Sequence, residues 1–251
     1  MKEWLSGRNP IYETLRAHRR QPFRLWVAQG VEEKGRLTEI LGLASACKLP
    51  VEYVPRARLD SLTANHQGVA LEASEYPYCD LTDILERAAE QQEFPFVLIL
   101  DTLQDPQNLG TLLRTAEAVG VHGILLPFRR TATITPAVVH ASSGACEHLL
   151  ITQTNLAQAI ATLKQKGLWI VGLESSVEAS HLAEVQLDGP LALVVGSEGE
   201  GMRALVRKSC DFLLRLPMRG QIESLNAAVA GSIVLYFAWR ERLSKNLNFA
   251  S

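Results

Sequence analysis

The sequence is poor in cysteine, in aromatic residues and in net charge. Of its 251 residues four are cysteine and 6% are aromatic, and 25 Lys and Arg residues stand against 27 Asp and Glu, for a net charge of -2. The cysteines form no CxxC pair and have no histidines at zinc-finger spacing, which excludes a zinc finger and a disulfide framework. The near-neutral balance excludes a protein that holds nucleic acid by bulk charge, but it leaves room for a local basic patch.

The chain also lacks a long apolar run. One of its longest stretches without a charged residue, residues 224–239, is shorter than the roughly 18 to 20 apolar residues that span a bilayer, and it contains Asn226 and Ser232. The first residues carry charges and lack the apolar segment of a signal peptide. We therefore expect no membrane segment, a reduced cytoplasmic protein, and a buried helix within residues 224–239.

The remaining composition is that of a globular protein. Hydrophobic residues make up 47% and charged residues 21%, which suffices for a core in one large or two ordinary domains. Residues 1–76 hold 11 Lys and Arg against 9 Asp and Glu, and the remainder holds 14 against 18. Within the front part, Arg16, Arg19, Arg20 and Arg24 cluster. Such a cluster could contact phosphates, or it could be an ordinary solvated helix end.

The spacing of apolar residues predicts two α/β domains. In the front part it predicts helices over 9–18 and 33–47 and strands over 23–29, 51–55 and 68–74. A proline-containing segment from Tyr76 marks a boundary, so we expect domains over 1–76 and 94–251, joined by a linker and a connecting helix over 77–93. In the second domain, apolar runs alternate with helical patterns, which is typical of a parallel sheet covered on both faces. The predicted strands are 96–100, 123–127, 168–173, 191–196 and 212–218.

Three loops that follow these strands carry unusual polar residues. Ligands of open parallel sheets bind beyond the carboxyl ends of the strands, so these loops are the candidate site. After strand 96–100, Asp105 and Pro106 form a turn, Asn108 suits a helix N-cap, and Arg114 follows about two turns into the helix. Taken singly, each of these residues is more often a cap or a solvated side chain than a ligand.

The second loop, residues 196–202, is rich in glycine but is a poor phosphate site. Its GxxGxG spacing is neither a dinucleotide-binding nor a Walker pattern, and Glu198 and Glu200 would repel phosphates. A neutral or cationic ligand therefore fits better. In the third loop, Ser224 and Asn226 stand where the chain enters the apolar helix, as caps or as ligands.

With these three loops in this order, the chain resembles the SpoU (TrmH-like) family of RNA ribose 2'-O-methyltransferases. The first motif comprises Asp105, Pro106, Asn108, Leu109, Gly110 and Arg114, the second Gly196, Glu198, Gly199 and Gly201, and the third Ser224, Leu225 and Asn226. Residues 7–15 and 66–74 are similar to the family's N-terminal RNA-binding domain, which has a ribosomal-protein-like fold. The two-domain layout is most similar to the family's bacterial 23S rRNA guanosine enzymes.

The resemblance implies a fold, a cofactor and partners. The fold is a parallel-sheet domain of SPOUT type whose C-terminal segment forms a trefoil knot, preceded by a small α/β domain over 1–76 that binds the RNA substrate. The cofactor is S-adenosylmethionine (SAM), no metal is needed, and the catalytic domains form a homodimer. The residues expected around SAM are Val195, Gly196, Glu198, Gly199, Leu216, Met218, Ser224 and Leu225.

The resemblance also implies catalytic roles. Arg114 would contact the target phosphate or ribose, and because a guanidinium has a pKa above about 12 it would orient the hydroxyl rather than accept its proton. Asn108 would support the loop, Glu198 would orient Arg114 or Asn108, and Ser224 with Asn226 would fix the two pockets. Alternative interpretations are a tRNA methyltransferase or a resistance-type rRNA methylase of the same family, and further a non-catalytic RNA-binding assembly factor. A nucleotide-phosphate enzyme fits least, because of Glu198 and Glu200.

Overall fold

The computed structural model describes residues 2–63, 65–176, 178–197, 199–222 and 224–249, with side chains as far as residue 244. The chain divides into two compact units. The first comprises Met1–Pro77 together with Thr133–His148, and the second comprises Tyr78–Ala132 together with Leu149–Ser251. A segment from the middle of the chain thus folds with the N-terminal unit.

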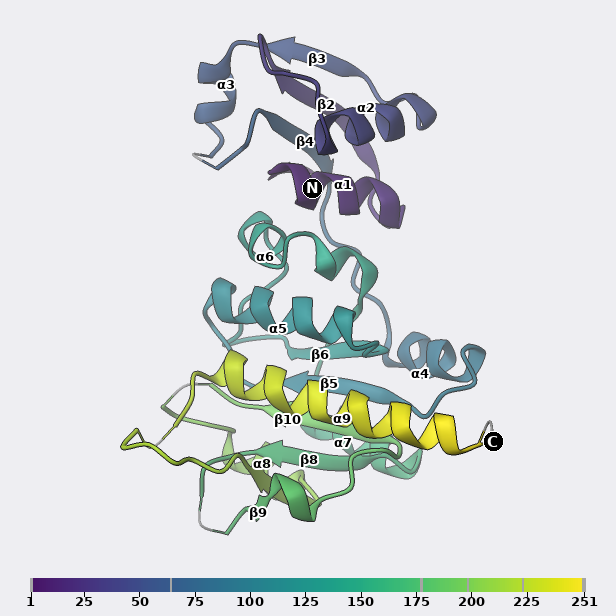
Figure 1. Cartoon of the computed structure of the whole chain (residues 1–251), viewed down its shortest axis with the longest axis vertical. Coiled ribbons are helices and arrows are strands. Elements are labelled where there is room, and N and C mark those ends of the chain that lie inside the picture. The colour runs from purple at the N-terminus through teal and green to yellow at the C-terminus, as the bar shows by residue number, and fades with distance from the viewer. Residues whose placement is uncertain (1, 64, 177, 198, 223, 250–251) are drawn as a thin grey trace. The chain divides into compact units, whose positions relative to one another are not determined.

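The N-terminal unit is a four-stranded sheet with helices (Figure 1). Its strand order is β1-β4-β2-β3, with β1 Lys2–Ser6, β2 Pro22–Ala28, β3 Val51–Val54 and β4 Val69–Ser74. β4 runs antiparallel to β1 and β2, whereas β2 and β3 are parallel. The helices are α1 Arg8–Ala17, α2 Arg36–Ala46 and α3 Arg56–Asp60.

The apolar spacing explains the two longer helices of this unit. α1 buries Ile11 and Leu15, one turn apart, and α2 buries Leu37, Ile40 and Ala44 along one stripe. These helices and strands β2 to β4 confirm the predicted ranges to within a few residues. The prediction missed β1 and α3, since β1 is a short terminal strand that depends on pairing with β4, from Lys2 opposite Ser74 onward.

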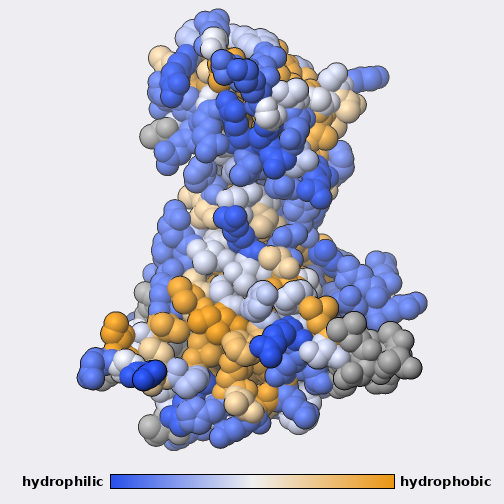
Figure 2. Space-filling model, viewed as in Figure 1, coloured by the Kyte–Doolittle hydropathy of each residue, from blue (hydrophilic) through white to orange (hydrophobic). Residues whose placement is uncertain are grey.

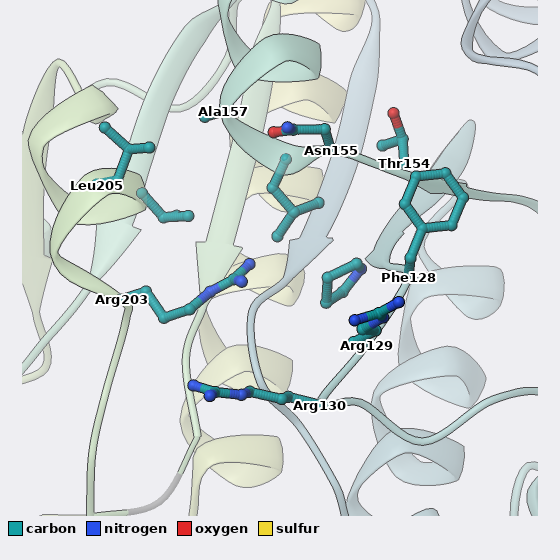
Figure 3. Close-up of a pocket in the computed structure, with 11 residues that line it drawn as sticks. Phe128, Arg129, Arg130, Thr154, Asn155, Ala157, Arg203 and Leu205 are labelled. Carbon is teal, nitrogen blue, oxygen red and sulfur yellow. The ribbon is translucent and has the colours of Figure 1, made fainter.

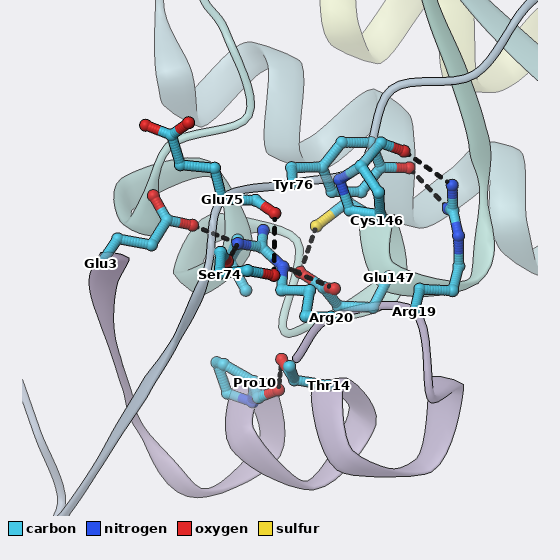
Figure 4. Close-up of polar contacts among 12 residues, drawn as sticks. Glu3, Pro10, Thr14, Arg19, Arg20, Ser74, Glu75, Tyr76, Cys146 and Glu147 are labelled. Atoms are coloured by element: carbon cyan, nitrogen blue, oxygen red, sulfur yellow. Dashed lines mark hydrogen bonds and ion pairs between the residues drawn. The ribbon is translucent and has the colours of Figure 1, made fainter. Parts of the chain in front are cut away.

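A buried ion pair attaches the segment Thr133–His148 to this unit. The segment contains α6 Pro136–Ala141 and the 3-10 helix η1 Ala145–His148. The Arg20 Nε donates to both carboxylate oxygens of Glu147, at 3.0 and 2.9 Å, and both side chains are fully buried (Figure 4). Arg20 also pairs with Glu3 and donates to the Ser74 carbonyl oxygen at 2.9 Å. Burial raises the pKa of the neighbouring Cys146 thiol, which therefore stays neutral.

This ion pair corrects one interpretation of the arginine cluster. Arg20 is held inside the protein by carboxylates, so it is not a phosphate contact. Arg24 is paired with Glu72, its Nε lying 3.0 Å from the carboxylate. Two of the four clustered arginines are therefore neutralised within their own unit.

The second unit is a seven-stranded parallel sheet covered on both faces, as predicted. The strand order is β7-β6-β5-β10-β8-β11-β9, with β5 Phe96–Leu100, β6 Gly123–Pro127, β7 Leu150–Thr154, β8 Trp169–Leu173, β9 Ser180–His181, β10 Leu191–Val195 and β11 Phe212–Arg215. Every residue of β5, β6 and β10 is buried. From β5 the chain adds β6 and β7 on one side and places the later strands on the other, so the order reverses between β5 and β10. Such a switch point is where open sheets bind ligands.

The helices of this unit are α4 Leu81–Glu90, α5 Pro106–Ala118, α7 Leu156–Gln165, α8 Ala204–Ser209 and α9 Ala227–Phe249, with the 3-10 helix η2 Leu182–Glu184. α5 and α9 pack side by side on one face (Figure 1). Residues of α4, α7 and α8 form one apolar core with alternate residues of the central strands, such as Ala192 and Val194. The elements that the prediction missed here include β7 and β9, whose sequences are short and partly polar.

Helix α9 is only partly buried, which corrects the expectation of a buried helix. Val229, Tyr236 and Phe237 are 45%, 55% and 39% exposed, and Figure 2 shows apolar side chains gathered over this part of the unit. The apolar residues of this helix therefore form two faces. One is buried within the unit, and the other is exposed. Among the described residues, no helix has the length and apolar composition of a bilayer span.

We predict that Glu147→Ala lowers the free energy of unfolding by about 3 to 5 kcal/mol, because it leaves the buried Arg20 without its partner. Denaturant unfolding measures the change. Arg16→Ala is the control, since Arg16 is exposed and its pair with Glu13 should contribute less than about 1 kcal/mol. Equal losses in the two variants would contradict a structural role for the buried pair.

Candidate functional site

A cleft of about 470 Å³ lies at the carboxyl edge of the sheet, beyond β10 and β8 and beside the start of α9. The cofactor residues expected from the sequence come together here, since all of those that the structure describes line this cleft. They are Val195, Gly196, Gly199, Leu216, Met218, Ser224 and Leu225. Glu198, which was expected to contact the cofactor and to orient Arg114 or Asn108, lies outside the described residues.

The glycines of the second loop let the chain fold back on itself. Ser197 and Gly201 form an antiparallel bridge, each donating its N–H to the other's carbonyl oxygen at 3.1 Å. A Cβ on Gly196 would lie 2.3 Å from the Gly201 carbonyl carbon, so no side chain fits there. Gly199 and Gly201 have φ angles of +84° and +67°, a region that favours glycine. The glycine spacing thus follows from the turn itself, and a phosphate is not needed to explain it.

A buried carboxylate anchors the far end of this loop. Asp101 directly follows β5 and is fully buried, and it accepts the Arg203 main-chain N–H at 2.8 Å and the Arg203 Nε at 2.7 Å. The loop after β10 is thereby tied to the end of the neighbouring strand. Sequence reasoning missed Asp101, although a carboxylate placed directly after a wholly apolar strand was a usable signal.

Two asparagines join the first and third motifs. The Asn226 Nδ2 donates to the Asn108 Oδ1 at 3.0 Å, and the Asn226 Oδ1 accepts the N–H groups of Ala228 and Val229 at 2.9 and 3.1 Å. Asn226 therefore caps α9 as it reaches α5. The sequence suggested Asn108 as the N-cap of α5, and this prediction is wrong. The N-cap is Asp105, whose side chain accepts the N–H groups of Gln107 and Asn108.

Arg114 lies on α5 as an exposed side chain and is not among the described residues that line the cleft. The next residue, Thr115, has its hydroxyl 2.9 Å from the Ser232 hydroxyl of α9, which fixes this part of α5 against α9. The structure thus places Asn108 in the first turn of α5, and Ser224 and Asn226 just before α9. Arg114 lies farther along α5.

The cleft also contains an ionised carboxylate that the sequence did not suggest. Glu174 lines it and receives bonds from the Arg207 Nε and Nη2 at 2.8 and 3.0 Å. These hydrogen bonds from Arg207 lower the pKa of Glu174 below its ordinary value. The arrangement suits a neutral or cationic ligand better than a phosphate. No group of three or more His, Cys, Asp or Glu side chains in the described part of the chain could hold a metal ion.

A parallel sheet with polar loops at its switch point defines an α/β protein that binds a small ligand at its carboxyl edge. Comparison with known proteins identifies the family. The profile of the SpoU rRNA Methylase family matches residues 95–236, and the profile described as RNA 2'-O ribose methyltransferase substrate binding matches residues 4–79. The chain therefore belongs to the SpoU rRNA methylase family, as its three motifs predicted, and is an RNA ribose 2'-O-methyltransferase.

Individual relatives resemble the chain over nearly its whole length. A Bacillus subtilis protein whose name places it in the TrmH family of tRNA/rRNA methyltransferases is 43% identical over 96% of both chains. The crystal structure of an RNA 2'-O ribose methyltransferase has 26% identity and a TM-score of 0.75, covering 96% of this chain and 89% of its own. An AdoMet-bound rRNA methyltransferase from Sinorhizobium meliloti shares the fold, with 24% identity, a TM-score of 0.78 and coverage of 95% and 87%.

We predict that Asn226→Ala lowers the free energy of unfolding by about 1 to 2 kcal/mol, because α9 loses its cap. Asn226→Asp should retain most of that stability, since a carboxylate still accepts the two N–H groups although it no longer donates to Asn108. Denaturant unfolding of both variants checks this. If the Asp variant loses as much as the Ala variant, the cap is not what Asn226 contributes.

Proposed function

We propose that this chain transfers a methyl group from SAM to the ribose 2'-hydroxyl of a guanosine in 23S rRNA. The observation that carries the proposal is that the second and third motif loops line one cleft at the carboxyl edge of the sheet, and that the Asn226–Asn108 hydrogen bond joins the first motif to it. SAM would supply the methyl group from a sulfonium: the carbon–sulfur bond would break as the oxygen–carbon bond forms, a neutral thioether would remain, and the hydroxyl proton would pass to solvent.

The cleft has the size and chemistry for SAM. A volume of about 470 Å³ falls within the usual range for small-molecule sites. Val195, Leu216, Met218 and Leu225 offer apolar contacts, and Gly196, Gly199 and Ser224 bring main-chain and hydroxyl groups to the same space. Glu174 adds a polar group to the lining, and its charge is compensated by Arg207. Glu198 is proposed to complete this site.

The chain's own residues would orient the acceptor. The Arg114 guanidinium would hold the substrate phosphate or ribose, which aligns the 2'-hydroxyl with the donor. The hydrogen bond between Asn108 and Asn226 would keep the entrances of α5 and α9 at a fixed distance while substrate binds. Ser224 would position cofactor and substrate, and Glu198 would orient Arg114 or Asn108.

The choice of RNA follows from the N-terminal unit of the chain. The match of residues 4–79 to a substrate-binding family supports a structured RNA held by a dedicated domain, as in the domain division 1–76, 77–93 and 94–251 that we propose. The description of the matching family as rRNA methylases supports an rRNA substrate, and such a reaction would take place in the cytoplasm. The Bacillus relative is named for tRNA as well as rRNA, so a tRNA substrate is the second candidate. Mapping of ribose methylation at nucleotide resolution, in rRNA and tRNA with and without this protein, decides between them.

We predict that Arg114→Ala lowers methyl transfer to undermodified rRNA by about 100-fold or more while SAM binding is unchanged, because an oriented charge at the reacting hydroxyl is lost. Transfer of labelled methyl groups and calorimetric SAM titration give the two readouts. Full activity in Arg114→Ala would contradict the assigned role.

We predict that Gly196→Ala abolishes SAM binding, since its Cβ would displace the Gly201 main chain. The same calorimetric titration measures this loss.

We also propose that two chains pair through their catalytic domains, over the exposed apolar face of α9. Phe237→Arg should convert the protein to a monomer, because a guanidinium would then lie in an apolar contact. Sedimentation analysis measures the mass. Phe94→Arg is the control, since Phe94 is also exposed (54%) but lies before β5, outside α9. A wild-type protein that sediments as a monomer would contradict the pairing.

A further inference from the structure

A second cleft lies at the carboxyl edge of the same unit. It has a volume of about 520 Å³ and is lined by the ends of β6 and β7, the start of α7 and the start of α8. Arg129, Arg130 and Arg203 line it, together with Phe128 and Asn155. No acidic residue is among the described residues that line it. We call it the arginine cleft.

The arginines of this cleft come from two loops. In Figure 3, Arg203 and Arg130 extend into the cleft from different loops, and the ring of Phe128 lies near Thr154 at another side. The Arg203 Nε donates to the buried Asp101, and this bond uses one of the five N–H groups of the guanidinium, so the terminal nitrogens are available to a ligand. Asp101 thus fixes the direction of one guanidinium from beneath the cleft.

The loop that carries the other two arginines is also held in place. The Thr131 hydroxyl and the Ala132 N–H both donate to the Leu103 carbonyl oxygen, at 3.0 and 2.8 Å. Arg130 has a φ of +60°, a conformation that residues other than glycine adopt rarely. The loop is therefore fixed in a conformation that its sequence alone would not favour.

Phe128 is the most exposed aromatic residue of the described chain, at 67%, and Leu205 on the facing side is 64% exposed. Apolar side chains with this exposure gain from being covered. A ligand of this cleft must therefore present a flat apolar surface and negative charge together. A nucleotide of a single-stranded RNA does so, because its base stacks on aromatic rings and its phosphate pairs with guanidinium groups.

We infer that the arginine cleft binds one nucleotide of the RNA strand next to the methylated ribose, with its base on Phe128 and its phosphate on Arg130 and Arg203. This inference rests on the proposed function. The loop after β10 separates the two clefts, since Gly199 and Gly201 line the cofactor cleft and Arg203, two residues later, lines the arginine cleft. A strand that places one nucleotide in the arginine cleft is thereby held beside the loop that faces the cofactor.

The test measures binding of a fluorescent single-stranded oligouridylate of about 12 nucleotides, a length that spans one binding groove. Phe128→Ala should weaken binding about 5-fold or more, and Phe128→Tyr should restore it, because the ring is what stacks. Arg130→Ala should reduce the slope of log K against log salt by about 0.7, the value for one lost phosphate contact on a single strand. SAM binding should be unchanged in all three variants.

Matched controls lie outside the cleft. Phe94→Ala removes another exposed ring, before β5, and Lys166→Ala removes one exposed cation after α7; both should leave affinity and salt slope at the wild-type values. If wild-type protein transfers methyl groups to rRNA but Phe128→Ala and Arg130→Ala bind and react as wild type does, the inference is overturned and the proposed function stands. If wild-type protein binds SAM but transfers no methyl group to any RNA, the proposed function itself fails.

Discussion

The buried bond between Asp101 and Arg203 is the constraint on which the carboxyl edge of the catalytic unit depends. A carboxylate without solvent must be paired and hydrogen-bonded, and Asp101 meets this need by accepting both the main-chain N–H and the Nε of Arg203. Asp101 directly follows β5, and Arg203 lies at the end of the loop that follows β10. The Asp101 side chain therefore ties the loop after β10 to the end of the neighbouring strand β5. That loop forms one wall of the cofactor cleft and supplies one arginine to the arginine cleft. Both candidate sites thus share a single anchor.

A buried ion pair also stabilises the N-terminal unit. Arg20 and Glu147 are 127 positions apart in the chain, and their buried pair holds Thr133–His148 to the N-terminal strands. The segment begins directly after the loop of Arg129 and Arg130, so one short stretch of chain leaves the catalytic unit and enters the other. Sequence reasoning treated Arg20 as one of a surface cluster, because nothing local in the sequence shows which distant carboxylate will bury it.

The parts of the fold that could be predicted are those in which local pattern and burial agree. The runs FVLIL and GILLP are apolar at every position, and they form β5 and β6 at the predicted residues. The short polar strands β7 and β9 gain their order from neighbours, so their sequences gave little signal. At the site, the motif residues of the cofactor cleft could be named from their resemblance to a family. Glu174 could not, since its importance arises from Arg207, a partner that only the folded chain supplies. Asp101 has a local signal, its place directly after an apolar strand, but the sequence does not show that Arg203 is its partner.

Net charge illustrates the same limit for function. The catalytic half is acidic overall, with 18 acidic against 14 basic residues from position 77 onward, yet its arginine cleft has no acidic residue among the described residues that line it. Arg129 and Arg130 are neighbours in the sequence, but Arg203 joins them only because β10 pairs with β5, with Val195 opposite Leu100. In the N-terminal half the opposite occurs, since carboxylates neutralise Arg20 and Arg24. Strand pairing and burial therefore decide which charged side chains a nucleic acid can reach. The net charge of either half of the sequence does not identify them.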